Sequence, residues 1–146
     1  VCYKFGKKME NNSIFIEKLR SSGLRPTKQR IRICKLLFDR NKTFHFTIND
    51  LSKILQKENS KQISVATIYN TINSFKKKGY LKEISVNKDK IYFDTNTSDH
   101  HHFLDINTNE LIDLKKEHVE KIRIKKNLSG KKINSIELLV KIENSN

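Results

Sequence analysis

The 146-residue sequence predicts an α+β fold with two domains, and three observations support this prediction. Apolar residues recur at helical spacing from residue 12 to residue 79. The apolar spacing then becomes two over residues 81–95, and again over 133–142, as in strands. Net charge divides the chain at the same place, because residues 1–94 carry 21 Lys and Arg against 8 Asp and Glu, whereas residues 95–146 carry 9 against 8. We therefore expect a basic domain over 1–94 and a near-neutral domain over 95–146.

Three helices are expected first in the basic domain, after about ten frayed residues. The stretch "NSIFIEKLRSSG" ends at Gly23, a residue type favoured just after a helix. The second helix follows Thr27, a good N-cap, and its apolar stripe includes Cys34, which we expect to be a small buried hydrophobe. Thr47 and Asp50 resemble a capping box at the start of the third helix.

The fourth helix, "SVATIYNTINSFKKKG", carries the most functional information. Ser64 is expected to cap it and Gly79 to end it. Its inward stripe is predicted to consist of Val65, Ile68, Ile72 and Phe75, and its other face of Thr67, Asn70, Thr71 and Ser74, with Tyr69 at the border and Lys76, Lys77 and Lys78 at the end. Short hydrogen-bonding side chains suit base edges, whereas lysines suit phosphates.

A β-hairpin is predicted next, from "LKEISV", the turn "NKDK" and "IYFDT". Helices followed by such a hairpin predict a winged helix-turn-helix domain, whose recognition helix enters the major groove of double-stranded DNA. A membrane surface and a merely solvated basic face remain weaker explanations of the charge. The residues expected to contact DNA are Arg25, Lys28, Ser64, Thr67, Tyr69, Asn70 and Lys77.

The second domain is predicted to be a small α/β unit. Strands are expected around "HHFLDI", "ELIDL" and "INSIELLVKI", with a short helix around "KEHVEKIRIKKN". Because 52 residues form a thin core, we expect a homodimer through the sheet, which would match a palindromic operator; a higher oligomer remains open.

Histidines and acids form a candidate metal site. His100 and His102 would point to one side of a strand, with Asp113 on the strand beside it, Asp94 at the end of the hairpin and His45 before the third helix. Three nitrogens and two carboxylates suit Fe(II), Mn(II) or Zn(II). Such a site would make DNA affinity depend on a ligand. A solvated histidine run, without function, is the alternative.

The chain resembles the ferric uptake regulator family in "GLRPTKQR", "ISVATIYNTINSF", "YFDTNTSDHHHF" and "ELIDL". This resemblance implies a winged-helix domain, a dimerisation domain and an interdomain metal site, which falls on His45, Asp94, His100, His102 and Asp113. Most members also hold a structural zinc with two C-x-x-C pairs. Here the first pair falls on Asp105 and Thr108 and the tail has no cysteine, so we expect no four-cysteine zinc.

Within the family, "DTNTSDHHHF" looks most like the iron response regulator branch, which lacks the cysteine pairs. That likeness implies a regulator of iron homeostasis that senses haem through His100, His101 and His102. Cys2 is a weak haem ligand, because Tyr3 replaces the proline of the Cys-Pro haem motif. The alternative is a repressor that Fe(II) or Mn(II) activates, as in the iron-responsive or peroxide-sensing branches.

Two further function classes fit less well. An Fe(II) oxygenase could use two histidines and a carboxylate, but it would leave the basic half unexplained, so we expect no enzyme. A sensor-free nucleoid protein would leave the histidines and acids idle. No apolar run approaches the roughly 20 residues that span a bilayer, and we expect a cytoplasmic protein without a membrane partner.

Overall fold

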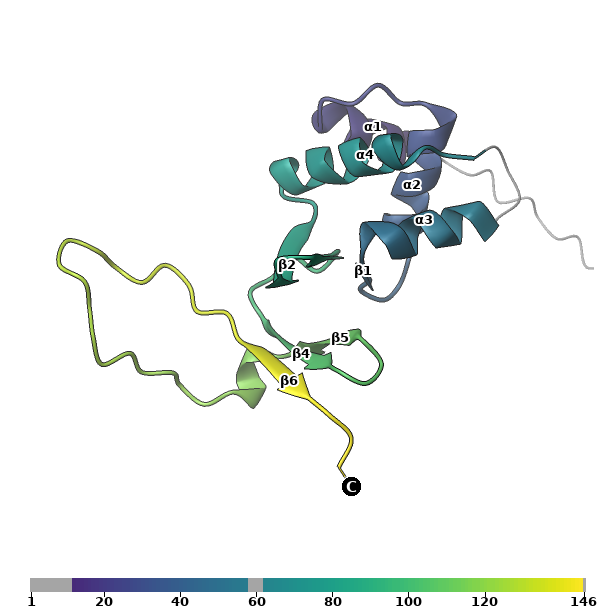
Figure 1. Ribbon diagram of the computed structural model, residues 1–146. Helices are drawn as coiled ribbons and strands as arrows, with labels where there is room; N and C mark the ends of the chain where they lie inside the picture. Colours follow the sequence, from purple (N-terminus) through teal and green to yellow (C-terminus); the bar gives the residue numbers. More distant parts are fainter. Residues whose placement is uncertain (1–11, 58–61, 146) are drawn as a thin grey trace, which may run out of the picture. The chain divides into compact units, whose positions relative to one another are not determined.

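The computed structural model describes residues 12–57 and 62–145, and the chain divides into two compact units after Thr97 (Figure 1). Helices and one small sheet form the amino-terminal unit, and a second small sheet forms the carboxy-terminal unit. The α+β class that the sequence predicts is therefore confirmed. Cys2 and the expected frayed end lie outside the described residues. No described helix is both long and apolar enough to cross a membrane.

Helices α1 (Ser13–Ser21), α2 (Lys28–Phe38), α3 (Ile48–Lys57) and α4 (Val65–Lys78) begin and end where local signals place them. The Thr27 hydroxyl accepts from the Arg30 amide at 3.3 Å, and the Ser64 hydroxyl accepts from the Thr67 amide at 3.1 Å. Gly79 ends α4 in the left-handed conformation with φ +88°. These three predictions are confirmed.

The capping box of α3 is also confirmed. The Asp50 carboxylate accepts from the Thr47 amide at 3.0 Å, and the Thr47 hydroxyl accepts from the Asp50 amide at 3.1 Å. Two amides that the first turn of a helix leaves unpaired are thus satisfied reciprocally.

The helices enclose one apolar core. Its largest fully buried side chains include Phe46 and Phe75, and Cys34 lies among them as the sequence predicts. Two assignments on α4 were wrong: Val65 is exposed and Thr71 is fully buried. Val65 is the first residue of α4 and lies one turn before Ile68, which is fully buried in the core. Thr71 can be buried because its hydroxyl donates to the Thr67 carbonyl at 2.7 Å.

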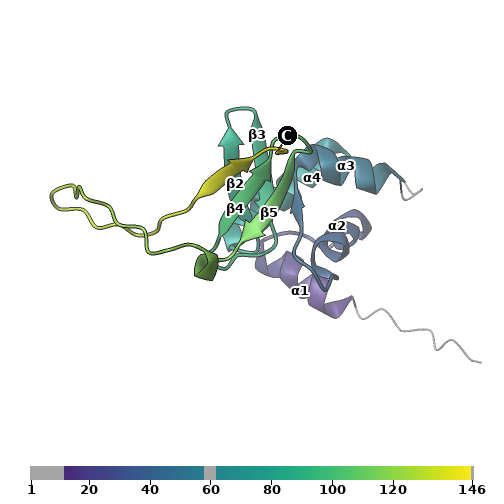
Figure 2. The ribbon, with the colours of Figure 1, turned by 90° about the horizontal axis from the view of Figure 1, so that it is seen from below.

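A three-stranded sheet completes the amino-terminal unit, in the order β1-β3-β2, and Figure 2 shows its strands β2 and β3 side by side. Strands β2 (Lys82–Asn87) and β3 (Lys90–Asp94) form the predicted hairpin. Strand β1 (His45–Phe46) pairs with β3 in antiparallel register, with His45 opposite Asp94. The sequence did not predict β1, because two residues show no periodicity.

The carboxy-terminal unit is built on β4 (His101–Asp105), β5 (Glu110–Leu114) and β6 (Leu139–Ile142), in the order β5-β4-β6. Strand β5 pairs with β4 antiparallel, and β6 pairs with β4 parallel.

Side-chain acceptors hold the turn between β4 and β5 and the end of the chain. The Asp105 carboxylate accepts from the amides of Asn107 and Thr108 at 2.8 and 3.2 Å. The Asn107 side-chain oxygen accepts from the Asn144 amide at 2.8 Å. The segment after β6 is therefore attached to this turn.

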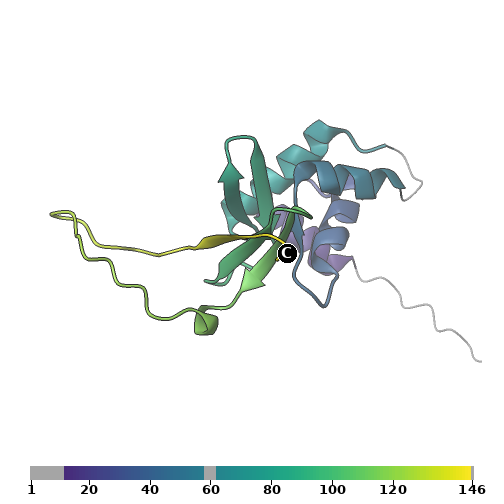
Figure 3. The same cartoon turned by 60° about the horizontal axis from the view of Figure 1, so that its bottom comes forward.

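The predicted helix over 116–127 was wrong. A short 3-10 turn spans Lys116–His118, and residues 119–138 then follow an extended path without regular secondary structure (Figure 3). Ile122 and Ile124 alternate with Arg123 and Lys125, which is spacing two rather than helical spacing. Gly130, at φ +70°, lies in the turn that reverses the path.

Candidate metal centre and nucleic-acid interface

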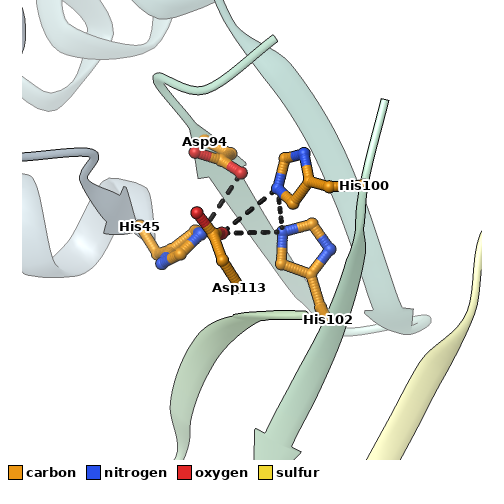
Figure 4. A group of neighbouring side chains, drawn as sticks. All are labelled: His45, Asp94, His100, His102 and Asp113. Carbon is orange, nitrogen blue, oxygen red and sulfur yellow. Dashed lines mark hydrogen bonds and ion pairs between the residues drawn. The ribbon is translucent and has the colours of Figure 1, made fainter. Parts of the chain in front are cut away.

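Three of the predicted ligands come together within the carboxy-terminal unit: His100, His102 and Asp113, here called the histidine group (Figure 4). His100 directly precedes β4, two residues before His102, so its imidazole lies on the same side as that of His102, and the β4–β5 register places His102 opposite Asp113. The His100 Nε2 atom lies 3.0 Å from His102 Nε2 and 3.1 Å from Asp113 Oδ1. His102 Nε2 lies 3.6 Å from the same carboxylate oxygen. Both histidines are buried.

A backbone carbonyl determines which nitrogen of His100 carries a proton. His100 Nδ1 lies 2.8 Å from the Ser98 carbonyl oxygen, which can only accept a hydrogen bond. Nδ1 therefore donates, and Nε2, which carries a lone pair when the ring is neutral, is the nitrogen that faces His102 and the Asp113 carboxylate. Histidines that bind metals typically donate their second N–H to such a carbonyl. A cation at Nε2 would satisfy the lone pair and the carboxylate together.

The other two predicted ligands form a pair within the amino-terminal unit. The β1–β3 register sets His45 opposite Asp94, and His45 Nε2 lies 3.2 Å from Asp94 Oδ2. Asp94 is fully buried, and its Oδ1 accepts from the Asn96 amide at 2.7 Å. A buried carboxylate requires a partner charge or hydrogen bonds, and this one has both an imidazole and an amide. Figure 4 draws both groups.

His101 does not belong to the histidine group. It points to the opposite face of β4, where its Nδ1 accepts from the Leu138 amide at 3.1 Å. This hydrogen bond fixes the position of the backbone just before β6, because Leu138 directly precedes that strand. The three consecutive histidines therefore do not act from one face, as a shared haem site would require.

The donor set fits a divalent transition metal. Imidazole nitrogen with carboxylate oxygen suits Fe(II), Mn(II) and Zn(II), and thiolates are not needed. The hydrogen bond from His100 Nδ1 to the Ser98 carbonyl leaves Nε2 as the ring nitrogen available to bind a metal. Each group is assembled by the strand register of its own unit.

The residues expected to read bases lie on one exposed stretch of α4. The Tyr69 side chain is 60% exposed, and Asn70 is exposed beside it. Thr67 is half-buried, and its hydroxyl lies 2.9 Å from that of Ser64 at the start of the helix. Ser64 therefore caps the helix, and its side chain is engaged within the protein.

The residues expected to contact phosphates are also exposed. Lys77 lies in the last turn of α4, Lys28 opens α2, and Arg25 lies in the loop before α2. By contrast, Lys76 is paired with Glu83 at 2.5 Å. Arg32, another α2 cation, donates to the Leu55 carbonyl at 2.7 Å.

Sequence reasoning missed a cavity of about 410 Å³ beside Tyr69. It lies among the start of α3, helix α4 and the β2–β3 hairpin, and Asn73, Lys90 and Phe93 line it with Tyr69. Asn73 is four residues after Tyr69, so helical spacing was the available signal. Lys90 and Phe93 are distant from Tyr69 in sequence, so no spacing in the sequence linked them to the cavity.

Comparison with known proteins gives three kinds of similarity. The model of the "Ferric uptake regulator family" matches residues 21–141. Over 98 residues the chain is 35% identical to the peroxide operon regulator of Bacillus subtilis, covering 67% of this chain and 66% of that protein. It is 34% identical, also over 98 residues, to the peroxide-responsive repressor PerR of Staphylococcus aureus, covering 67% and 64%. The matched region thus spans just under two thirds of these curated relatives.

Solved structures show the same fold at low sequence identity. The ferric uptake regulator of Vibrio cholerae superposes with a TM-score of 0.66 at 20% identity, over 88% of this chain and 98% of that one. The ferric uptake regulator of Pseudomonas aeruginosa, described with manganese, gives 0.63 at 20% identity over 91% and 99%.

Proposed function

Because the chain belongs to the ferric uptake regulator family, we propose that it is a DNA-binding transcriptional regulator whose DNA affinity depends on a divalent metal ion. The observation that carries this proposal is the histidine group, in which the Nε2 atoms of two buried imidazoles converge on one carboxylate oxygen. A sensor-free DNA protein gives no reason for that arrangement, and an oxygenase would leave the basic charge of residues 1–94 unexplained.

In this proposal His45, Asp94, His100, His102 and Asp113 coordinate one ion. The ion would supply positive charge that both carboxylates need. Ligands from both units would make their relative orientation depend on the ion, and DNA affinity would follow that orientation. His100 and Asp94 would enter the site already oriented, because Ser98 and Asn96 hold them.

For the metal we propose Mn(II) or Fe(II), with Zn(II) as a further candidate of the same donor preference. The names of two relatives concern peroxide, and we propose peroxide as the signal in this chain as well. Haem is less well supported, since His101 faces away from His100 and His102. The iron response regulator branch has no relative among the proteins named above.

For the DNA contacts we propose two classes. Thr67, Tyr69 and Asn70 would lie near base edges, with Ser64 capping the helix that presents them. Arg25, Lys28 and Lys77 would lie near phosphates. A homodimer would match a palindromic operator, with one α4 helix in each half-site.

The test is fluorescence anisotropy on an operator selected from a random duplex pool by the Mn(II)-loaded protein. We expect Mn(II) to raise affinity at least tenfold, and His102→Ala to abolish that increase. His118→Ala is the matched control, because His118 is exposed and outside the histidine group. Equal affinity with and without Mn(II), at fixed salt, would show that the metal does not control binding.

Two additions to the same assay identify the signal. Hydrogen peroxide should release the Fe(II)-loaded protein and leave the Zn(II)-loaded protein bound, because Zn(II) has no redox chemistry. Haem should have no effect on the apo protein. Release by haem would instead support the haem hypothesis.

A further inference from the structure

The near-neutral charge of the carboxy-terminal unit conceals two opposite regions. Residues 121–132 contain six Lys and Arg and no Asp or Glu. The remaining residues of 98–146 contain 3 Lys and Arg against 8 Asp and Glu. We call residues 121–133 the basic arm. The unit therefore carries one strongly basic segment beside an acidic remainder of net charge −5.

The basic arm leaves large aliphatic side chains uncovered. Ile124, Leu128 and Ile133 are 50%, 68% and 53% exposed. The arm turns back at its tip, where the Lys131 amide donates to the Leu128 carbonyl at 3.1 Å. Figures 1, 2 and 3 all show it leading away from its own sheet. Ile124 and Leu128 are therefore uncovered on the unit that carries them, whereas Ile133 borders a hollow beside His101.

The sheet of the same unit has an uncovered apolar row. Strand register places Phe103 beside Ile112 on β5 and beside Val140 on β6. Ile112 and Val140 are 39% and 36% exposed. Because side chains alternate along a strand, this apolar row lies on the face opposite the histidine group. A partner could cover the row without approaching the metal ligands.

Acidic side chains lie on the same face, beside the apolar row. Asp105 and Glu110 are paired in register, two residues beyond the Phe103–Ile112 pair, so alternation sends them to the same side. An apolar row flanked by carboxylates is complementary to a segment that combines exposed aliphatic side chains with lysines. The basic arm is such a segment, and its sequence, "KIRIKKNLSGKKI", alternates the two kinds of residue over its first five positions.

We propose that the basic arm of one copy lies across the apolar row of a second copy. This inference rests on the proposed homodimer and identifies the surfaces that form it. Two copies related by a two-fold axis could exchange arms reciprocally, since each copy carries both surfaces. DNA phosphates would match the lysines, but they would leave the aliphatic side chains and the apolar row without a partner.

Disulfide trapping tests the contact directly. Leu128→Cys and Ile112→Cys are made in separate proteins of different tag length, each with Cys2→Ser. Cys34 can remain, because burial raises the pKa of its thiol to about 12 and keeps it protonated and unreactive. We expect the mixture to form the mixed dimer at least tenfold faster than a mixture of Leu128→Cys with Ile14→Cys, an exposed position on α1. Equal rates would overturn the proposal.

Sedimentation equilibrium gives a second, independent measurement. Replacement of Ile124, Leu128 and Ile133 by Ser should raise the dimer dissociation constant at least tenfold. Ile106→Ser is the matched control, since Ile106 is an equally exposed isoleucine in the β4–β5 turn. Circular dichroism verifies that each variant is folded.

The possible failures are distinguishable. If the triple variant dimerises like the parent, the arm is not the contact, while the dimer stands. An unchanged dimer with a smaller salt dependence of DNA binding would make the arm a DNA contact and would overturn the proposal. A parent that stays monomeric would overturn both the arm contact and the homodimer, whereas metal-dependent DNA binding is measured separately.

Discussion

At His100, one backbone carbonyl decides what the imidazole can do. The Ser98 oxygen accepts a hydrogen bond from Nδ1 and thereby directs Nε2, the nitrogen nearest Asp113, toward the other ligands. The sequence predicts His100 and Asp113 as ligand types, because their spacing follows from strand alternation. It does not predict the tautomer, because that depends on where the chain before β4 turns. The alternative interpretation of the histidine run, a solvated loop without function, is inconsistent with the burial of all three histidines.

Tyr69 and Lys77 should have different effects on DNA recognition. We expect Tyr69→Ala to reduce the affinity ratio between operator and random DNA, by about 1–3 kcal/mol if the ring contacts a base. Lys77→Ala should weaken binding to both DNAs about equally and lower the salt dependence by about one phosphate contact. Anisotropy titrations at several salt concentrations measure both quantities. Equal losses of discrimination in the two variants would contradict this division.

At the level of secondary structure, the residues that cap or end a helix within one turn were predicted correctly. Thr27, Ser64 and Gly79 act through atoms within three or four residues of themselves, so their roles can be read from the sequence. Thr71 and Val65 were misplaced because burial depends on what lies opposite the helix. Strand β1 was missed for the same reason, since only its pairing with β3 defines it.

In the basic arm, by contrast, a local sequence signal predicted the wrong secondary structure. Lysine-rich residues 116–127 suit a helix by composition, yet the alternation of isoleucine with basic residues and the turn at Gly130 favour an extended path. A structureless stretch of this length is uncommon in a compact domain and usually has a function. Helix propensity therefore predicted the wrong structure, whereas the two-residue spacing of the isoleucines indicated the extended path.

Gly79 should be needed for its backbone conformation alone. At φ +88° a Cβ meets no atom within 4 Å, so Gly79→Ala introduces strain without a clash. We expect it to lower the free energy of unfolding by about 1–2 kcal/mol, and Gly79→Asn to cost less. Urea denaturation followed by circular dichroism measures the shift.

Gly130→Ala is the control for Gly79→Ala. Gly130 has a similar φ of +70° but lies in the arm turn of the other unit, where a Cβ also meets nothing. Its replacement should leave the unfolding transition of the amino-terminal unit unchanged. If Gly79→Ala were equally silent, the left-handed end of α4 would not contribute to stability.

For the whole molecule, charge is distributed in a way that composition alone conceals. Residues 1–94 carry most of the net +14, and the predicted DNA contacts all lie within them. The near-neutral remainder is polarised, with its cations in the arm and its acids around the sheet. The sequence predicted the first division by counting, but the second became visible only when strand register placed Asp105 and Glu110 beside the apolar row.

Binding to DNA should therefore depend steeply on salt. If about six to ten phosphates are neutralised per complex, affinity should fall roughly 10³–10⁵-fold between 50 and 200 mM salt. Anisotropy with Mn(II) held constant measures the slope of log affinity against log salt. A flat response would be incompatible with phosphate contacts from Arg25, Lys28 and Lys77.

The attachment of the final segment has a consequence for oxidative stress. The side-chain oxygen of Asn107 accepts from the Asn144 amide, and the Asp105 carboxylate closes the turn that carries Asn107, so neither contact involves a sulfur atom. Residues 98–146 contain no cysteine. Thiol oxidants and mercurials thus have no target there. The proposed peroxide signal would therefore act at the histidine group without oxidising any thiol in residues 98–146.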